Sequence, residues 1–568
     1  MATKQRVLVI GGTACGPKAA SRIKRLEPES EVTLLERSST LSFGACGMPY
    51  FVEGLFDDID TLTETPVGVK RTVGFFKHCK GVEVHIHTEA ERIDREKQEV
   101  VARNTASGEE LVFPFDRLVL ATGARAVRPP IPGAELDNIW TMKESQDAVT
   151  LSQAISEQGA KRAVIVGGGH IGVEMAEALS RRGLEVTIVE MFDQILPQLL
   201  DKEMAMLGAK HLQSKGVRLK LGAKVTAFTG QDRVDGVSME QENLPADIVL
   251  ISAGVKQNDE LAREAGLECY PSGGIKINHF CQTSDPCIYA GGDCVLNAYL
   301  HPLLRSPLYI PLGSTANKHG RVIADNICGK ATPFPGVKGT SICKAFDFTF
   351  ARTGISETTA QQEGHEVETF LCTSPDRPHY FPGAAPLAVK LIVSRRSRVV
   401  LGAQVVGPGA ADKRIDVAAS AIAFKATLDD LGNIDLSYAP PYSPPIDPIT
   451  VGAYCLNNKL DGLANGVPPL QAKQWMDQEQ ELVLLDVRTP QEVEAMWLDD
   501  DRVLNIPLGQ LRERADEQLP RDKDILAFCK VSMRGYEAQR VLQGLGFERV
   551  WFIEGGLVGW PFAAATPK

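Results

Sequence analysis

The sequence contains one local pattern twice: a short apolar strand, then a glycine-rich turn, then a segment of helical character. In the first copy, an apolar run at 6–10 is followed by the turn GGTACG at 11–16. In the second copy, an apolar run at 163–166 is followed by the turn GGGHIG at 167–172. This order places backbone N–H groups and a helix N-terminus where the pyrophosphate of a dinucleotide binds. The chain is therefore predicted to contain two α/β dinucleotide-binding units.

Each copy also continues into a second strand that ends in a carboxylate. Glu36 and Glu190 lie about 20 residues beyond their glycines, where a carboxylate can accept hydrogen bonds from ribose hydroxyls. In the first copy Thr13 replaces the usual middle glycine, and support comes from two further strands with turn glycines at 118–123 and 288–293. The alternative is that these two segments are ordinary strand ends. The predicted cofactor-binding residues are Gly11, Gly12, Gly16, Glu36, Arg37, Thr122, Gly123, Gly292 and Asp293 in the first unit and Gly167, Gly169, Gly172 and Glu190 in the second.

The composition of the chain excludes several classes of protein function. A chain of 568 residues is expected to form three to five domains, and a net charge of -11 does not indicate a nucleic-acid-binding face. No apolar run approaches the roughly 20 residues that span a bilayer, and the N-terminal apolar run leads directly into the glycine turn. The 12 cysteines include no CxxC pair, which is typical of thiols in a reducing compartment. We expect a soluble cytoplasmic enzyme with neither a metal site nor a membrane partner.

The residues from about 331 onward differ in composition from the nucleotide-binding part. Strands are expected at 387–393 and 399–406, a helix at 413–424, and a rigid loop at the proline-rich 438–445. After the glycine- and proline-containing 465–469, the last 100 residues have the size of one domain. There a strand at 524–528 leads into Cys529 and the loop CKVSMR, whose backbone N–H groups and two basic side chains would stabilise a thiolate.

A second cysteine of interest is Cys46, in the stretch LSFGACGMPY at 41–50. The nearest cysteines in sequence are Cys15 and Cys79, so no local dithiol can form. Disulfide reductases usually use one sulfur to attack the substrate and a second to resolve it. A lone sulfur needs a partner from outside the chain, such as a small thiol, or it cycles through sulfenic acid or persulfide. The alternative is a small, buried, inert cysteine.

Residues from about 4 to 455 resemble the pyridine nucleotide-disulfide oxidoreductases, and the SFxxCGxPY form around Cys46 is similar to their single-cysteine branch. Within that branch the chain looks like the coenzyme A-disulfide reductases and their rhodanese-fused relatives, the NAD(P)H-dependent polysulfide and CoA-persulfide reductases. The resemblance implies an α/β architecture with two Rossmann-like domains, an α+β dimerisation domain and a C-terminal rhodanese-like domain. The expected boundaries are 1–150 and 276–330 for FAD binding, 151–275 for NAD(P)H binding, 331–455 for dimerisation, 456–470 for a linker and 471–568 for the rhodanese-like domain.

The same resemblance implies the cofactors FAD and NADH (or NADPH), and CoA-linked sulfur substrates. It also implies a homodimer in which the partner contributes tyrosines to the active site. Tyr380 and Tyr438 match those positions best, with Tyr442 as the alternative to Tyr438, and Cys529 corresponds to the persulfide-bearing residue. Without the resemblance, each tyrosine is equally well explained as an aromatic anchor at the dimer interface.

The phosphates of CoA require cations, which arginine binds through two parallel hydrogen bonds. Ser42, near Cys46, is a candidate contact for the pantetheine arm. The alternative for the basic residues is an ordinary solvated helix face. The candidate cations are Arg22, Lys24, Arg25, Arg71 and Lys77.

Two departures from the related patterns bear on function. The NADH oxidases and peroxidases of this branch carry a catalytic histidine in the first glycine turn, where this chain has Ala14, which favours sulfur chemistry. The rhodanese-like unit lacks a recognisable GHIPGA segment after Asp486, so the sequence supports an independent sulfurtransferase activity of this unit more weakly than it supports the reductase activity.

The predicted function is reduction of CoA disulfide, CoA persulfide or polysulfide at Cys46, with sulfur supplied by Cys529. The alternatives are a flavin NADH oxidase or peroxidase, and a sulfur-carrier or redox-sensing interaction protein.

Overall fold

The computed structural model describes residues 4–301, 306–478 and 481–565. The chain divides into two compact units. The first contains 4–191, 223–300 and 306–337, and the second contains 192–222, 301, 338–478 and 481–565. Residues 192–222, expected within the NAD(P)H-binding domain, therefore group with the C-terminal half of the chain.

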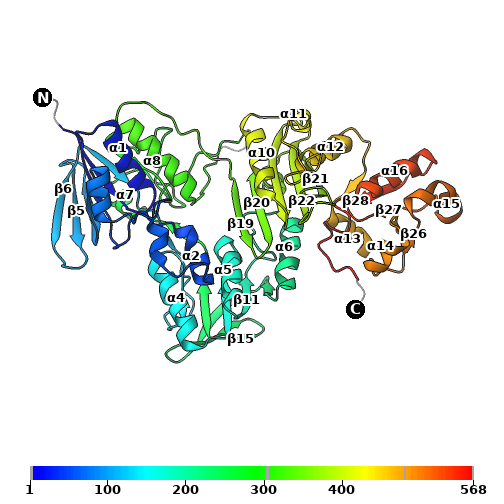
Figure 1. Cartoon of the computed structure of the whole chain (residues 1–568), viewed down its shortest axis with the longest axis horizontal. Helices are drawn as coiled ribbons and strands as arrows, with labels where there is room; N and C mark the ends of the chain where they lie inside the picture. Colours follow the sequence, from blue (N-terminus) through cyan, green and yellow to red (C-terminus); the bar gives the residue numbers. More distant parts are fainter. Residues whose placement is uncertain (1–3, 302–305, 479–480, 566–568) are drawn as a thin grey trace. The chain divides into compact units, whose positions relative to one another are not determined.

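The first glycine turn lies at the edge of a five-stranded parallel sheet. Strand register pairs Ile10 with Leu35 and with Leu120, so the turn, Glu36 and Thr122 all emerge at the same carboxyl edge. Helices α1 (Cys15–Leu26) and α8 (Gly313–Ile327) pack against each other in this unit (Figure 1). In spatial order the strands are β18 (Ile288–Ala290), β7 (Arg117–Leu120), β1 (Arg6–Ile10), β2 (Glu31–Leu35) and β3 (Glu83–His85).

The second glycine turn belongs to another parallel sheet, so the prediction of two α/β nucleotide-binding units is confirmed. Its strands in this unit are, in spatial order, β11 (Glu185–Glu190), β10 (Arg162–Val166), β16 (Ile248–Ile251) and β9 (Ile139–Trp140), and helix α5 (His170–Arg181) follows the turn. The antiparallel elements are β4 (Thr88–Asp94), β5 (Glu99–Asn104), β6 (Glu110–Pro114), β13 (Val225–Gly230), β14 (Val234–Met239), β15 (Asn243–Pro245) and the ribbon of β8 (Ala124–Ala126) and β17 (Val255–Gln257). The remaining helical segments are α2 (Met48–Glu53), α3 (Val73–Phe75), α4 (Ser145–Gln158), α7 (Glu260–Glu264), η1 (Ala45–Gly47), η2 (Ile59–Thr63) and η3 (Phe76–Lys80).

The second unit begins with α6 (Lys202–Ser214) and β12 (Arg218–Leu221). Helix α6 packs against an antiparallel sheet, where buried Lys390 pairs with Asp201, Glu203 and Glu357. This buried ion cluster explains why α6 groups with the sheet rather than with the nucleotide-binding unit. The sheet order is β19 (Ser341–Ala345), β20 (Phe348–Gly354), β23 (Val400–Gly407), β22 (Pro386–Ser394) and β21 (Val367–Pro375); the helices are α9 (Glu357–Gln362), α10 (Ala411–Ala423), α11 (Leu428–Asn433) and α12 (Pro448–Leu460).

The last domain is a five-stranded parallel sheet around a core that includes Phe528, Phe552 and Trp560. Its strands in spatial order are β24 (Gly466–Val467), β28 (Val550–Ile553), β27 (Ile525–Phe528), β25 (Val483–Asp486) and β26 (Val503–Asn505). Its helices are α13 (Pro469–Gln478), α14 (Pro490–Ala495), α15 (Leu511–Gln518), α16 (Met533–Gly544) and η4 (Leu508–Gln510).

The expected linker at 456–470 is not a free connection. Helix α12 continues to Leu460, and β24 pairs with β28 of the last domain. Buried Glu554, just after β28, pairs with Lys459 at 2.7 Å and accepts the N–H of Leu371 at 3.0 Å. The glycine and prolines that indicated a linker instead end one element and begin the next, and the last domain is fixed to the antiparallel sheet.

Within the part of the chain that the structure describes, no helix combines the length and the apolar character needed to cross a membrane.

Candidate active site

The first glycine turn is closed so tightly that side chains would not fit. Gly11 has φ +109°, and a Cβ there would lie 2.1 Å from the oxygen of Ala121, while a Cβ on Gly16 would lie 1.9 Å from the oxygen of Gly11. Thr13, which weakened this motif in the sequence, is exposed and meets no such restriction. Glu36 reaches under the turn, where its Oε2 accepts the Gly12 N–H at 2.7 Å. The turn therefore presents backbone at short range, as a pyrophosphate requires.

The second turn repeats this geometry. Gly167 has φ +111°, and a Cβ on Gly172 would lie 2.1 Å from the oxygen of Gly167. Glu190 Oε2 accepts the Gly168 N–H at 2.6 Å, in the same way as Glu36 does in the first unit. No heavy atom would lie within 4 Å of a Cβ at Gly169, so this glycine faces open space.

The segment after β18 carries polar atoms that the protein does not satisfy. Gly292 N–H donates to Nδ1 of His319 at 3.1 Å, and His319 is fully buried on α8. Among the described residues, the buried atoms without a hydrogen-bond partner include His319 Nε2, the side-chain amide of Asn297 and the hydroxyl of Tyr309. Because a buried unpaired polar group costs free energy, these atoms fit a polar cofactor beside the first glycine turn. Thr122, expected to bind cofactor, already donates to the carbonyl of Asn258 at 2.6 Å.

Cys46 lies in η1, directly before α2, and is exposed. Ser42 adopts φ +50° and its N–H donates to the carbonyl of Gly12 at 2.7 Å, which ties the cysteine loop to the first glycine turn. Arg71 donates to the carbonyl of Ser42 at 3.4 Å and to that of Thr63 at 3.1 Å. Ser42 and Arg71 therefore help to hold the loop that carries Cys46 against the first glycine turn.

The charges around Cys46 come from residues that the sequence did not single out. The pKa of the Cys46 thiol is raised, first by desolvation and then by the carboxylates of Glu174 and Asp293, while Lys143 opposes the rise. Lys143 also pairs with Asp293 at 3.4 Å. Burial and the nearby Glu177 raise the pKa of Glu174 to about 7. These side chains make the surroundings of Cys46 acidic on balance.

Helix α5 explains how Glu174 reaches this place. The helix starts at the second glycine turn and packs against α2, and Arg182 at its C-cap donates to the carbonyl of Val52 at 2.9 Å. One helix therefore connects the second nucleotide unit with the segment that carries Cys46. A helical periodicity in the sequence could place Glu174 on α5, but not beside a cysteine more than a hundred residues earlier.

Several of the predicted CoA-binding cations have other partners. Arg22 donates twice to Oδ1 of Asp325 on α8, at 2.8 and 2.5 Å, and both side chains are largely buried. This prediction is corrected: Arg22 holds α1 against α8 and is not free for phosphate. Lys24 donates to the carbonyls of Pro28 and Ser30, whereas Arg25 is exposed. Lys77 pairs with Glu83, and both side chains are exposed. Arg37, predicted as a cofactor-binding residue of the first unit, pairs with Glu144, and these side chains are exposed too.

The candidate tyrosines of the second unit are all exposed. The exposed fractions are 66% for Tyr380, 52% for Tyr438 and 69% for Tyr442. Tyr380 lies in the loop after β21, which Asp376 anchors by accepting the N–H groups of Ala385 and Ala410.

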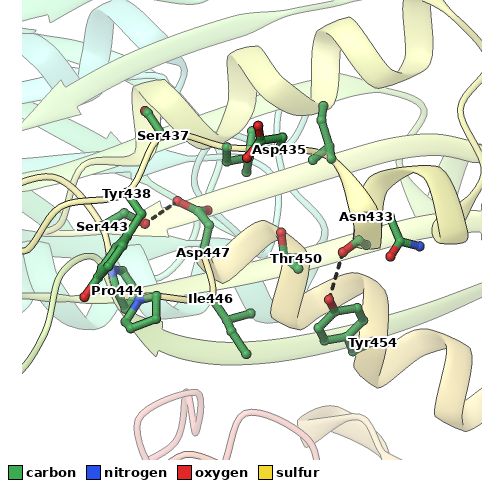
Figure 2. Close-up of a pocket in the computed structure, with 14 residues that line it drawn as sticks. Asn433, Asp435, Ser437, Tyr438, Ser443, Pro444, Ile446, Asp447, Thr450 and Tyr454 are labelled. Carbon is green, nitrogen blue, oxygen red and sulfur yellow. Dashed lines mark hydrogen bonds between the residues drawn. The ribbon is translucent and has the colours of Figure 1, made fainter.

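Tyr438 lines a cavity of about 340 Å³ in this unit (Figure 2). Ser443 and Asp447 shape the wall through a hydrogen bond of 2.9 Å, and Tyr454 donates to the carbonyl of Gly432. The loop around Tyr438 is therefore held in place while its aromatic ring is exposed, as an interface contact requires.

Cys529 is buried at the end of the central strand β27. Its carbonyl accepts the N–H of Leu557 at 2.9 Å. A Cβ on Gly556 would lie 2.6 Å from this carbonyl and 2.7 Å from the amide nitrogens of Val531 and Ser532, so the loop folds closely over a glycine. Ser532 has φ +73°, which lets the chain turn into α16. The sequence prediction of a cysteine in a tight strand–loop–helix segment agrees with this geometry.

One expectation for this loop needs correction. Of its two basic side chains, Lys530 is exposed, but Arg534 pairs with both carboxylate oxygens of Glu492 at 2.8 and 2.7 Å. The Arg534 guanidinium also interacts electrostatically with Cys529, which helps to raise the pKa of Arg534. Glu492 therefore largely balances the charge of Arg534, although this arginine still interacts electrostatically with Cys529.

Comparison with known proteins identifies the domains of the chain. A pyridine nucleotide-disulphide oxidoreductase model matches residues 5–320, its dimerisation domain matches 340–447, and a rhodanese-like domain matches 469–562. The chain belongs to the pyridine nucleotide-disulphide oxidoreductase family, whose members use FAD and take electrons from NAD(P)H.

Three individual proteins show the same relationship. The NAD(P)H coenzyme A polysulfide/persulfide reductase of Pyrococcus horikoshii is 35% identical over 453 residues, which cover 80% of this chain and 98% of the relative. The coenzyme A disulfide reductase of Staphylococcus haemolyticus is 30% identical over 79% of this chain and 99% of the relative. The solved structure of an NAD-dependent persulfide reductase from A. fulgidus has a TM-score of 0.93 and 42% identity, and covers 98% of this chain and 100% of that chain.

Proposed function

We propose that this protein is an NAD(P)H-dependent reductase of CoA persulfide, polysulfide or CoA disulfide, with Cys46 as the reacting sulfur. The observation that carries the proposal is the position of Cys46: exposed, joined by a backbone hydrogen bond to the first glycine turn, and without a second cysteine in its loop. Relatives that match almost their whole length to this chain are named for the same substrates. The rhodanese-like domain, with Cys529 in its loop, adds a second sulfur site.

The residues of the two glycine turns would bind two different cofactors. The turn at 11–16, Glu36 and the buried polar atoms near Gly292 would hold FAD, while the turn at 167–172 and Glu190 would hold NAD(P)H. When bound, these cofactors supply an electron pair to a sulfur–sulfur bond at Cys46.

Cys46 performs the covalent step. Its thiolate attacks the disulfide or persulfide bond of the substrate, a new S–S bond forms to Cys46, and the other sulfur leaves as a thiolate that takes up a proton. With CoA disulfide, the products are a Cys46–CoA mixed disulfide and free CoA. Two electrons and one proton per bond then restore the Cys46 thiolate and release the second thiol.

Protons for the leaving thiolates come from groups near the sulfur. Tyr380 and Tyr438 of a second copy are proposed donors, because their exposed hydroxyls and the matched dimerisation domain suit an active site completed across a homodimer. Replacing each tyrosine by phenylalanine should lower kcat about tenfold with little change in KM, and Tyr442→Phe in the same assay decides between Tyr438 and its alternative Tyr442. Equal losses in all three variants would indicate interface packing instead.

Glu190 should favour NADH over NADPH. A carboxylate accepts from the ribose hydroxyls and repels a 2′-phosphate, and the exposed residues that follow, Met191, Phe192 and Asp193, supply no cation. Glu190→Gln keeps an acceptor for the Gly168 N–H and should reduce the NADH preference in kcat/KM about tenfold. Glu36→Gln, the matching change in the first unit, should leave that preference unchanged. A clear NADPH preference of the unaltered protein would contradict this assignment.

The oxidase alternative predicts different chemistry. Ala14 stands where related oxidases and peroxidases have a histidine, so peroxide cleavage would lack an acid–base group that typically contributes roughly 10²–10⁴-fold. Oxygen consumption with NADH should accordingly be slow compared with CoA persulfide reduction. The sulfur-carrier alternative instead predicts slow NADH turnover with every small acceptor, and steady-state assays with oxygen, polysulfide and CoA disulfide distinguish all three.

A further inference from the structure

The sulfur loop of the last domain contains a cation whose charge is already balanced. Arg534, in the first turn of α16, donates through both terminal nitrogens to the two oxygens of Glu492 on α14. The same guanidinium interacts electrostatically with Cys529. Glu492 is ionised at any working pH, because its pKa is lowered to about 2, chiefly by its hydrogen bonds to Arg534. The Arg534–Glu492 pair that lies near Cys529 therefore carries no net charge.

The other cations near the loop do not replace this charge. Arg488 is buried and pairs with Asp486, and its remaining N–H groups donate to the carbonyls of Glu492 and Met496. Lys530 is exposed, and the described residues show no ion pair for it. A doubly charged sulfur donor would find one solvated lysine and a neutral ion pair near Cys529. These groups offset little of the free energy that the donor loses when its charges leave water.

We infer that Glu492 is a specificity-determining residue, which disfavours dianionic sulfur donors such as thiosulfate and favours donors with at most one charge beside the transferable sulfur, such as organic persulfides. The inference rests on the proposed sulfur-carrying role of Cys529. It fits the reductase, because a persulfide generated on a thiol carries the sulfane sulfur next to a single charge.

The transfer step is balanced without an external oxidant. The Cys529 thiolate attacks the outer sulfur of the donor, the new S–S bond gives Cys529 persulfide, and the donor's S–S bond breaks. The leaving group is sulfite from thiosulfate, methanesulfinate from methanethiosulfonate, or a thiolate from an organic persulfide. Thiosulfate and methanethiosulfonate therefore deliver the same sulfur with two charges and one charge, respectively.

Replacing Glu492 by glutamine removes the charge and can keep the local helix cap. Glu492 also closes a capping box with Thr489 at the start of α14, and glutamine can keep that hydrogen bond while removing the charge. Thr489→Ala is the matched control, because it breaks the cap but leaves the Glu492–Arg534 pair intact. Glu492→Asp should keep most of the wild-type selectivity, because it retains the charge.

The test measures formation of Cys529 persulfide by mass spectrometry on the full-length FAD-containing protein, with thiosulfate and with methanethiosulfonate. Glu492→Gln should raise the ratio of the thiosulfate rate to the methanethiosulfonate rate about fivefold or more, since it frees one positive charge near the sulfur. Thr489→Ala should leave the ratio unchanged. An unchanged or lower ratio in Glu492→Gln would overturn the inference.

Salt dependence provides a test that needs no variant. Because the pair is neutral, loading of the wild-type protein by thiosulfate should depend on ionic strength hardly more than loading by methanethiosulfonate. A several-fold steeper decrease for thiosulfate would contradict the inference. Loading of Cys529 by neither donor would instead refute its sulfur-carrying role, which distinguishes failure of the proposed function from failure of the selectivity.

Discussion

The two sulfur sites of this chain have opposite surroundings. Cys46 is exposed on a short turn of the first unit, and the nearby carboxylates of Glu174 and Asp293 help to raise its pKa. Cys529 is buried at the end of a central strand, where it interacts electrostatically with the guanidinium of Arg534. Cys46 is thus open to large substrates but gains little thiolate stabilisation from its own side chains. Cys529 is instead buried beside an arginine whose charge Glu492 balances, so the two cysteines differ both in exposure and in the charges around them.

The largest expected effect separates the two sites outright. Cys46→Ser should lower reduction of CoA disulfide, CoA persulfide and polysulfide at least about a thousandfold, because no other cysteine in its loop can form the covalent species. FAD should remain bound and reducible by NADH, since the glycine turns are untouched. Stopped-flow flavin reduction together with steady-state turnover checks both statements. Normal turnover of the variant would remove Cys46 from the mechanism.

Accessibility gives the next largest difference. In the NADH-reduced protein, iodoacetamide should modify Cys46 about a hundredfold faster than Cys529, because Cys46 is exposed and Cys529 is buried. The rate at Cys46 should still rise above pH 9, since a raised pKa keeps the thiol protonated to higher pH. Peptide mass spectrometry over time measures both rates. Faster labelling of Cys529 would reverse the comparison.

Cys529→Ser should have a selective effect. Turnover with polysulfide or another sulfane donor should decrease about tenfold, because tethering no longer raises the local sulfur concentration, while CoA disulfide reduction stays unchanged. The serine variant is a cleaner test than truncation near Pro468, which would also remove Glu554 and leave Lys459 without its buried partner. Equal turnover of the variant and the wild type with every substrate would end the delivery hypothesis.

The smallest expected effect concerns the charge beside Cys46. Glu174→Gln removes a carboxylate that raises the Cys46 pKa, so this pKa should decrease and alkylation at pH 8 should become about two- to threefold faster. The difference should fade below pH 7, where Glu174, with a pKa of about 7, is itself protonated. Glu96→Gln, an exposed change in the same unit, is the control. Slower alkylation of Glu174→Gln would show that its charge does not act on Cys46.

Much of the architecture was readable from local sequence patterns. The two glycine turns, their terminal carboxylates and both cysteine loops are each encoded within 30 residues, because a strand, a turn and a helix follow one another directly. The structure confirms both nucleotide-binding sheets and places Glu36 and Glu190 beneath their turns. Local composition was misleading at 456–470, where glycine and prolines delimit a helix and a strand rather than a linker.

The sequence could not show which charged side chains pair with one another in the folded protein. Arg22 pairs with Asp325, 303 positions away, and Arg534 with Glu492, 42 positions earlier, so neither cation has the role that its own segment suggested. The acidic setting of Cys46 likewise depends on Glu174, brought in by the packing of α5 on α2. The reason is physical: periodicity and turn chemistry act between neighbours in the chain, whereas electrostatic environment depends on distances in space. The sequence by itself determined the two glycine turns and the two cysteine loops, and the tertiary structure decided which charged side chains lie around each cysteine.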